Sequence, residues 1–116
     1  MKVAIIGSRN LVVNNLGDYL PEGLTEIVSG GAKGVDTTAR EYAIEHSIKI
    51  TEFLPEYSRY KRGAPLKRNI QIVEYADTVI AFWDGKSHGT KFVINYCNEH
   101  SIPIQVVLVN TTQEKA

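Results

Sequence analysis

A glycine-rich turn, placed between an apolar run and a helical pattern, contains the residue types best suited to binding chemistry. Residues 27–36 are Ile-Val-Ser-Gly-Gly-Ala-Lys-Gly-Val-Asp, with three glycines within five residues. Glycine permits a positive φ angle and lets a ligand approach the main chain without meeting a Cβ atom. A helix beginning after Gly34 would direct its free N–H groups and the positive end of its dipole into the turn. The pattern predicts an anion site, and a turn that uses glycine for geometry alone is the alternative.

The spacing of these glycines differs from that of two well-known phosphate-binding loops. A dinucleotide-binding G-x-G-x-x-G normally follows the first strand of its domain, whereas this G-G-x-x-G follows the second apolar run. A Walker-type loop needs G-x-x-x-x-G-K-[ST], and the Gly-Lys-Ser sequence at Gly85 has Ile80 in place of the leading glycine. The turn is therefore not an ordinary P-loop.

A second candidate for chemistry is the basic segment between residues 56 and 68. It has one acid and five basic residues, with Tyr57 and Tyr60 interleaved; the basic residues are Arg59, Lys61, Arg62, Lys67 and Arg68. Guanidinium groups bind phosphate oxygens in pairs, and tyrosine rings can stack on a base. Arg68 is the strongest candidate because it lies in the first turns of a helix whose apolar face other residues already supply. The alternative is a solvated basic loop.

Two carboxylates lie beside the expected turns, and each has two interpretations. Asp36, near the start of a helix, could cap that helix, which stabilises it by about 0.3–1 kcal/mol, or could accept a hydrogen bond from a ribose hydroxyl. Asp84, at the end of a strand, has the same ambiguity. The three histidines and Cys97 show no ligand spacing, so neither a metal site nor a cofactor is predicted.

Alternating strand and helix patterns provide the elements that position these residues. The expected strands cover residues 2–7, 26–29, 49–54, 78–83 and 104–109, and the expected helices cover 11–20, 35–46, 64–76 and a stretch ending near 100. Residues 56–63 lack hydrophobic periodicity and are expected to form a loop, and no internal repeat is evident. Such alternation predicts an α/β fold: a Rossmann-like three-layer sandwich with a five-stranded parallel sheet in the order 3-2-1-4-5.

This strand order places the candidate residues at one edge. The order reverses between the first and fourth strands, and ligands bind in the crevice beyond the carboxyl ends of strands at such a point. The turns at Gly7, Gly30 and Gly85 all follow strands and therefore lie at that edge. Three glycine turns at one edge favour a phosphate or nucleotide site.

Composition limits the functional class. The 116 residues, 43% of them hydrophobic, suit one domain over 1–110 followed by a polar tail at 111–116. Thirteen basic and thirteen acidic residues cancel, so nucleic acid is not the expected partner. No apolar run approaches the length of a membrane span, the N-terminal run suits a strand better than a signal peptide, and the single cysteine excludes an internal disulfide. A cytoplasmic protein is expected.

Four short motifs carry a family resemblance that covers nearly the whole chain. In chain order they are Gly7-Ser8-Arg9, Ser29-Gly30-Gly31-Ala32-x-Gly34-Val35-Asp36, Arg68-Asn69 and Gly89-Thr90. Together they resemble the SLOG superfamily, which includes DNA-processing protein A and the LOG-type phosphoribohydrolases, and in particular its small single-domain branch related to YspA and YpsA. The resemblance implies a SLOG-like Rossmann domain that binds a nucleotide or a nucleotide derivative, commonly as a homodimer.

The sequence departs from the LOG-type enzymes at one motif. Those enzymes carry G-G-x-G-T-x-x-E, and alignment on Gly89-Thr90 puts Val93 at the catalytic glutamate and Lys86 and Ser87 at the first two glycines. The departure disfavours LOG-type catalysis, and whether the protein is an enzyme stays open.

The predicted function is therefore binding of a nucleotide-derived phosphorylated ligand, ADP-ribose-like in kind, with a sensor role as one form of it and with a homo-oligomer expected. One alternative is a hydrolase of such a ligand that uses Asp36, Asp84 or Glu74. Another is a single-stranded nucleic-acid-binding module that uses residues 56–68. The predicted ligand-binding residues are Gly7, Ser8, Arg9, Ser29, Gly30, Gly31, Ala32, Gly34, Asp36, Arg68, Asn69, Asp84, Gly85, Gly89 and Thr90.

Overall fold

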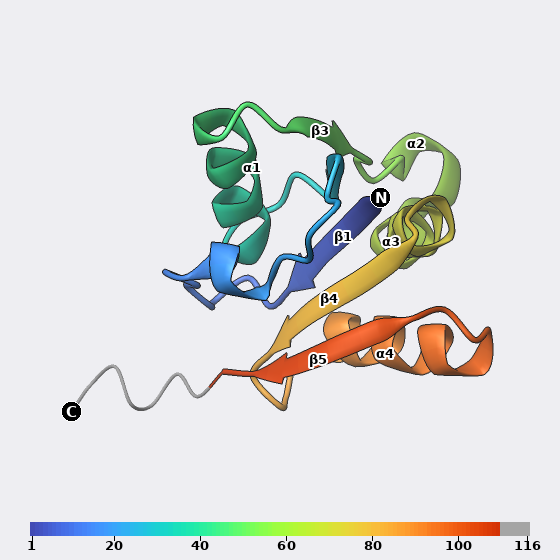
Figure 1. The fold of residues 1–116 in the computed structure, drawn as a ribbon. Helices are drawn as coiled ribbons and strands as arrows, with labels where there is room; N and C mark the ends of the chain where they lie inside the picture. The colour runs from blue at the N-terminus through green and yellow to red at the C-terminus, as the bar shows by residue number, and fades with distance from the viewer. Residues whose placement is uncertain (110–116) are drawn as a thin grey trace.

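The computed structural model describes residues 1–109 and contains a five-stranded parallel sheet. The strands are β1 (Lys2–Gly7), β2 (Glu26–Ser29), β3 (Lys49–Glu52), β4 (Thr78–Trp83) and β5 (Ile104–Leu108), in the order β3-β2-β1-β4-β5 (Figure 1). This confirms the predicted α/β, Rossmann-like fold and its strand order. The tail predicted at 111–116 lies outside the described residues.

Helices cover both faces of the sheet. The helix α1 (Val35–Glu45) lies on one face, and α3 (Ala64–Tyr75) and α4 (His88–Glu99) lie on the other (Figure 1). This division follows from right-handed crossovers, because the chain moves one way along the sheet from β1 to β3 and the opposite way from β3 to β5. Within residues 1–109, no helix is long and apolar enough to cross a membrane.

The central strands contribute to two separate cores. In β1, Val3 and Ile5 pack in the core beneath α1, whereas Ala4 and Ile6 pack in the core beneath α3 and α4. Successive side chains of a strand point to opposite faces, so a strand covered on both faces must be apolar throughout. This explains why the N-terminal run has no polar residue between Val3 and Ile6.

The helix predicted over residues 11–20 is wrong. A single 3₁₀ turn over Leu16–Tyr19 is the only helical part, although Leu11, Val13 and Leu16 are buried in the core beneath α1. Neighbouring asparagines and Gly17 are poor helix formers, and a Cβ atom at Gly17 would lie 2.9 Å from the Tyr42 hydroxyl. The apolar residues therefore fill the core from an irregular segment.

The loop predicted over residues 56–63 is also wrong in part. Tyr57–Tyr60 form one turn of helix, α2, and Lys61–Gly63 form a 3₁₀ turn that leads into α3. None of these residues is buried. A single exposed turn needs no apolar face, so it leaves no hydrophobic periodicity in the sequence.

Contrary to the expectation of no internal repeat, a short repeat ends two helices and begins both edge strands. Residues 42–50 are Tyr-Ala-Ile-Glu-His-Ser-Ile-Lys-Ile, and residues 96–104 are Tyr-Cys-Asn-Glu-His-Ser-Ile-Pro-Ile. In each copy the histidine ring stacks on the tyrosine ring one turn earlier, with ring centroids 4.0 Å apart. The serines, Ser47 and Ser101, have φ angles of 54° and 57°. These copies build the same left-handed helix ending twice.

The backbone hydrogen bonds of the two endings match as well. The N–H of Ile48 donates to the carbonyl of Ala43 at 2.8 Å, and the N–H of Ile102 donates to that of Cys97 at 2.9 Å. Both bonds run from the residue after the left-handed serine to a residue in the last turn, which satisfies a carbonyl that the helix itself leaves open. The repeat therefore reflects one solution to turning a helix back into an edge strand.

We expect the variants Ser47→Gly and Ser101→Gly each to raise the free energy of unfolding by about 0.5 kcal/mol. A left-handed φ costs a non-glycine residue about 1–2 kcal/mol. Glycine removes this strain, but it also destabilises the folded state by roughly 0.4–1 kcal/mol because it raises the conformational entropy of the unfolded chain. The relief of strain is the larger effect. Urea denaturation would measure the change. Ser47→Ala and Ser101→Ala keep the strain and should give no gain; a gain from alanine equal to that from glycine would contradict the explanation.

Candidate functional site

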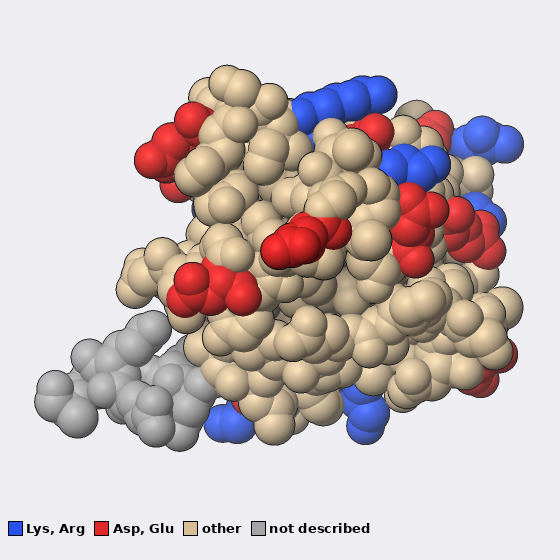
Figure 2. All heavy atoms as spheres, viewed as in Figure 1, with Lys and Arg blue, Asp and Glu red and all other residues tan. Residues whose placement is uncertain are grey.

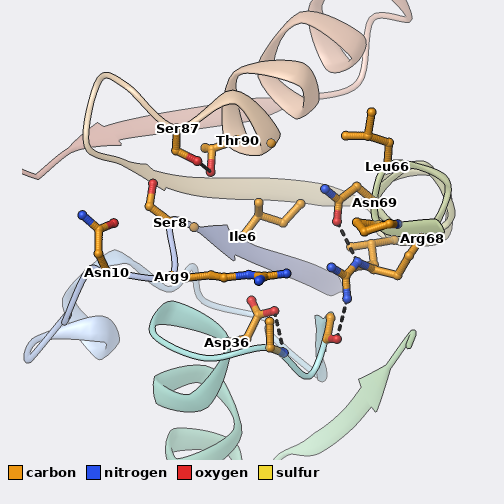
Figure 3. Close-up of a pocket in the computed structure, with 16 residues that line it drawn as sticks. Ile6, Ser8, Arg9, Asn10, Asp36, Leu66, Arg68, Asn69, Ser87 and Thr90 are labelled. Carbon is orange, nitrogen blue, oxygen red and sulfur yellow. Dashed lines mark hydrogen bonds between the residues drawn. The ribbon is translucent and has the colours of Figure 1, made fainter. Parts of the chain in front are cut away.

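A cavity of about 430 Å³ opens at the carboxyl end of β1, where the strand order reverses between β1 and β4. Its walls come from the end of β1, the turn after β2, the start of α1, the first turns of α3 and the start of α4 (Figure 3). Small-molecule sites typically measure about 300–1,000 Å³. The cavity is therefore large enough for a small ligand.

Most of the predicted site residues line this cavity, but some do not. Those that line it are Gly7, Ser8, Arg9, Gly30, Ala32, Asp36, Arg68, Asn69, Gly89 and Thr90. Those outside its lining are Ser29, Gly31, Gly34, Asp84 and Gly85. Lining residues that sequence reasoning missed are Ile6, Asn10, Pro65, Leu66, Ile72 and Ser87. Each missed residue lies within three positions of a predicted one, so the sequence located the turns but not the directions of their side chains.

Glycines of the glycine-rich turn within residues 27–36 allow close packing against other parts of the chain. Gly34 has a φ of 73°, and a Cβ atom there would lie 2.4 Å from the carbonyl oxygen of Arg9. A Cβ atom at Gly30 would lie 2.5 Å from Nη1 of Arg68 and 3.0 Å from Oδ2 of Asp36. Any side chain at position 30 would therefore displace the two charged groups beside it.

A carboxylate already occupies the start of α1. Oδ2 of Asp36 accepts a hydrogen bond from the N–H of Ala32 at 3.1 Å, and only 8% of Asp36 is exposed. Burial raises the pKa of the Asp36 carboxyl, and the Ala32 hydrogen bond and the charge of Arg68 oppose that rise. An external anion at this helix end would meet a like charge, and the hydrogen bond of Oδ2 holds the glycine-rich turn before α1 rather than capping an N–H group of the helix.

Arg68, predicted as a ligand-binding residue, lines the cavity but is also buried and makes structural contacts. Its Nη1 donates to the carbonyl of Gly30 at 2.6 Å and, more weakly, to that of Phe53 at 3.4 Å, and its Nε donates to Oδ1 of Asn69 at 2.8 Å. The pattern of apolar residues on α3 does not reveal these contacts, because the carbonyls of Gly30 and Phe53 belong to distant segments of the chain. Burial lowers the pKa of Arg68, the charge of Asp36 opposes this shift and the charge of Arg9 adds to it.

The start of α4 is open, in contrast to that of α1. Oδ1 of Asp84 accepts hydrogen bonds from the N–H groups of Lys86 at 2.9 Å and Ser87 at 2.8 Å, which lower the pKa of Asp84 and fix the turn. Lys91 is the first residue to bond backward, to the carbonyl of Ser87 at 3.2 Å. The N–H groups of residues 88–90 precede it and have no partner in the helix.

Ser8 adds a buried hydroxyl at the same place. Only 2% of Ser8 is exposed, and its Oγ has no hydrogen-bond partner among residues 1–109. Figure 3 shows this side chain pointing from the end of β1 toward Ser87 at the start of α4. Buried polar groups nearly always have a partner, so an unpartnered hydroxyl in a cavity wall indicates a place for a ligand atom.

The remaining walls combine charged and apolar surfaces. Figure 3 shows the guanidinium groups of Arg9 and Arg68 pointing toward one another across the cavity, above Asp36. Ile6 and Ile72 supply apolar surface, together with residues 65 and 66 at the start of α3. The arrangement can hold an anionic group at one end and an apolar ring at the other.

Comparison of the chain with protein-family models, curated proteins and solved structures gave no match. Within residues 1–109, no group of three or more His, Cys, Asp and Glu side chains is placed to hold a metal ion.

We expect Arg68→Ala to lower the free energy of unfolding by about 1.5–3 kcal/mol, because it leaves the buried carbonyl of Gly30 without its charged donor. Lys67→Ala is a matched control: Lys67 is the exposed neighbour of Arg68 on α3, and its replacement should change stability by no more than about 0.5 kcal/mol. Chemical denaturation of both variants would measure the difference. Equal effects of the two substitutions would show that the buried hydrogen bonds contribute nothing.

The raised pKa of Asp36 predicts a pH dependence of stability. Between the ordinary Asp value of about 3.9 and the raised value, the folded state holds more protons than the unfolded state, so stability falls as pH rises. The variant Asp36→Asn keeps an oxygen that can accept the N–H of Ala32, but it has no titrating carboxyl and so does not lose stability as pH rises. Its stability relative to the parent protein should therefore increase as pH rises through that window and then level off. A difference that stays constant from pH 3.5 to 8 would contradict the raised pKa.

Proposed function

We propose that the cavity binds a nucleotide or a nucleotide-derived phosphorylated ligand, ADP-ribose-like in kind. One observation carries the proposal: the unpartnered, buried Ser8 hydroxyl points toward the open start of α4. Free helix N–H groups and the positive end of the helix dipole attract an anion, and a hydroxyl beside them adds a donor. A phosphate group matches this combination.

The other walls suit the other parts of such a ligand. Oδ2 of Asp36 accepts a hydrogen bond from the N–H of Ala32, and Oδ1 could accept one from a ribose hydroxyl. Ile6 and Leu66 offer apolar surface to a base, and Leu66 is 39% exposed at the rim. Phosphate, sugar and base each have a chemically matched wall within one cavity.

The resemblance to the SLOG superfamily supports the same proposal. The motifs that carry it supply most of the cavity-lining residues, although Ser29, Gly31 and Gly34 of the glycine turn lie outside the lining. We propose that the chain is a SLOG-type domain whose ligand meets the start of α4 more closely than the glycine turn.

Binding is favoured over hydrolysis because of where the carboxylates lie. Val93, at the position of the LOG-type glutamate, is 1% exposed in the core beneath α4. Glu74 accepts a hydrogen bond from the Tyr96 hydroxyl at 2.5 Å and lies outside the cavity lining, and Asp84 holds the turn before α4. Among the described residues, Asp36 is the sole carboxylate in the lining.

A nucleic-acid-binding role has weaker support. The exposed basic residues Arg59, Lys61 and Arg62 lie outside the cavity lining. Figure 2 shows acidic and basic side chains interspersed on one face, with no large patch of a single sign, and the net charge is zero. Nucleic-acid binding depends on a basic surface that releases counterions, so a small ligand fits the charge distribution better.

A thermal-shift panel of nucleosides, mononucleotides, dinucleotides and ADP-ribose tests the proposal. A phosphorylated compound at 100 times its dissociation constant should add about 2.7 kcal/mol of stability, and nucleosides should add far less. No shift with any phosphorylated compound would refute the proposal. Chromatography of the same mixtures for released base would distinguish a hydrolase from a binding protein.

Two glycine variants test the position of the site. A Cβ atom at Gly89 or at Gly63 would meet nothing within 4 Å, and both glycines lie at helix starts, but only Gly89 lines the cavity. We expect Gly89→Val to weaken nucleotide binding at least tenfold, with stability changed by less than about 1 kcal/mol. Gly63→Val should leave affinity unchanged. Equal affinities of the two variants would place the ligand elsewhere.

A further inference from the structure

The cavity contains two separate places that attract an anion. One is the start of α4 with the Ser8 hydroxyl, and the other is the gap between the guanidinium groups of Arg9 and Arg68. We infer that the ligand carries two linked anionic groups, as a diphosphate does, and that Arg9 selects for the second group. This inference rests on the proposed function, because it names the class of phosphorylated ligand that the cavity takes.

The cavity lining carries one more cationic than anionic side chain, so Asp36 matches only part of the charge of the arginine pair. Two arginines and one carboxylate line the cavity, and the ion pairs among residues 1–109 join Arg40 to Glu52 and Lys49 to Glu26. Arg68 donates to carbonyl and amide oxygens, which carry no net charge. Two cations that face one another across a partly enclosed space repel, and an anion between them removes that repulsion.

The Ser8 and Arg9 side chains point to different parts of the cavity. Ser8 and Arg9 are consecutive residues, yet Figure 3 shows Ser8 pointing toward Ser87 and Arg9 pointing toward Arg68. Because the two side chains start from adjacent residues and diverge, the two places adjoin without coinciding. Two phosphate groups joined by one bridging oxygen would lie side by side along this wall.

The glycine turn is excluded as the second place by the carboxylate of Asp36. The N–H of Ala32 already donates to Asp36, so the turn offers an anion one donor fewer and a negative charge nearby. The Arg9 side chain is exposed and can move to meet a ligand, whereas Arg68 is fixed by its hydrogen bonds. The second anionic group therefore lies between a fixed guanidinium and a movable one.

Titration calorimetry with AMP, ADP, inorganic phosphate and inorganic pyrophosphate tests this inference at constant ionic strength. The parent protein should bind ADP at least tenfold more tightly than AMP, and pyrophosphate at least tenfold more tightly than phosphate. A charge-assisted hydrogen bond corresponds to about a ten- to hundredfold change in affinity, so Arg9→Ala should weaken ADP binding by that factor. The same variant should change AMP binding less than threefold.

Two further variants separate the two places. Ser8→Ala should weaken AMP and ADP binding alike, because both ligands place a phosphate at the start of α4. Lys33 is an exposed cation in the glycine turn and lies outside the cavity lining. Lys33→Ala removes only a screened long-range attraction, so it should change neither the AMP affinity nor the ADP affinity by more than about twofold. Arg9→Gln keeps the length and polarity of the side chain without its charge, and should reproduce Arg9→Ala.

The outcomes distinguish this inference from the proposed function. Equal affinities for AMP and ADP, or an Arg9→Ala effect of the same size on both, would overturn the two-anion inference while leaving nucleotide binding intact. Failure of every nucleotide and of both inorganic anions to bind would overturn the proposed function together with it. A loss of ADP preference in Arg9→Ala and Arg9→Gln, with AMP binding retained, supports it.

Discussion

The buried guanidinium of Arg68 joins three parts of the chain that the sheet alone would leave separate. It connects α3 to the carbonyl of Gly30 after β2 and, more weakly, to that of Phe53 after β3. The space for it exists because position 30 has no side chain, and Asp36 lies on the other side of the same glycine. One glycine, one arginine and one aspartate therefore define a wall of the cavity, and a change in any of them moves the others.

The starts of α1 and α4 both line the cavity, and they differ in the side chain at the second helical position. Parallel strands place the starts of α1 and α4 at the same edge, with equal dipoles. The second helical residue of α1 is Asp36, whose carboxylate accepts the N–H of Ala32, whereas the second helical residue of α4 is Gly89, which has no side chain. The first helix start thus has a carboxylate of its own chain beside it, whereas the N–H groups of residues 88–90 at the second have no partner in the helix.

The sequence predicted the sheet better than the site because strand patterns are local and site contacts are not. Runs rich in β-branched and apolar residues, followed by turn residues, located all five strands, including the partly exposed edge strands β3 and β5, and crossover handedness then gave their order. The helix prediction for residues 11–20 was wrong because an irregular segment that buries apolar residues can have the same composition as an amphipathic helix. The partners of Arg68 lie 38 and 15 positions away, so no window of sequence could show that it is engaged. Asp84 and Ser87 lie in one turn, and which of them faces the cavity depends on hydrogen bonds within that turn.

Several groups around the cavity are arranged at the expense of stability. Ser8 is buried without a partner, the guanidinium groups of Arg9 and Arg68 face one another, and burial raises the pKa of Asp36. Each arrangement is unfavourable in the free protein, since an unsatisfied buried group costs about 1–3 kcal/mol and close like charges repel. An anionic ligand would satisfy the hydroxyl and separate the two cations, so part of its binding free energy comes from relieving these contacts. Such a site is prepared in part, because the fold already orients the Ser8 hydroxyl and the Arg68 guanidinium, whereas the exposed Arg9 side chain has still to be ordered.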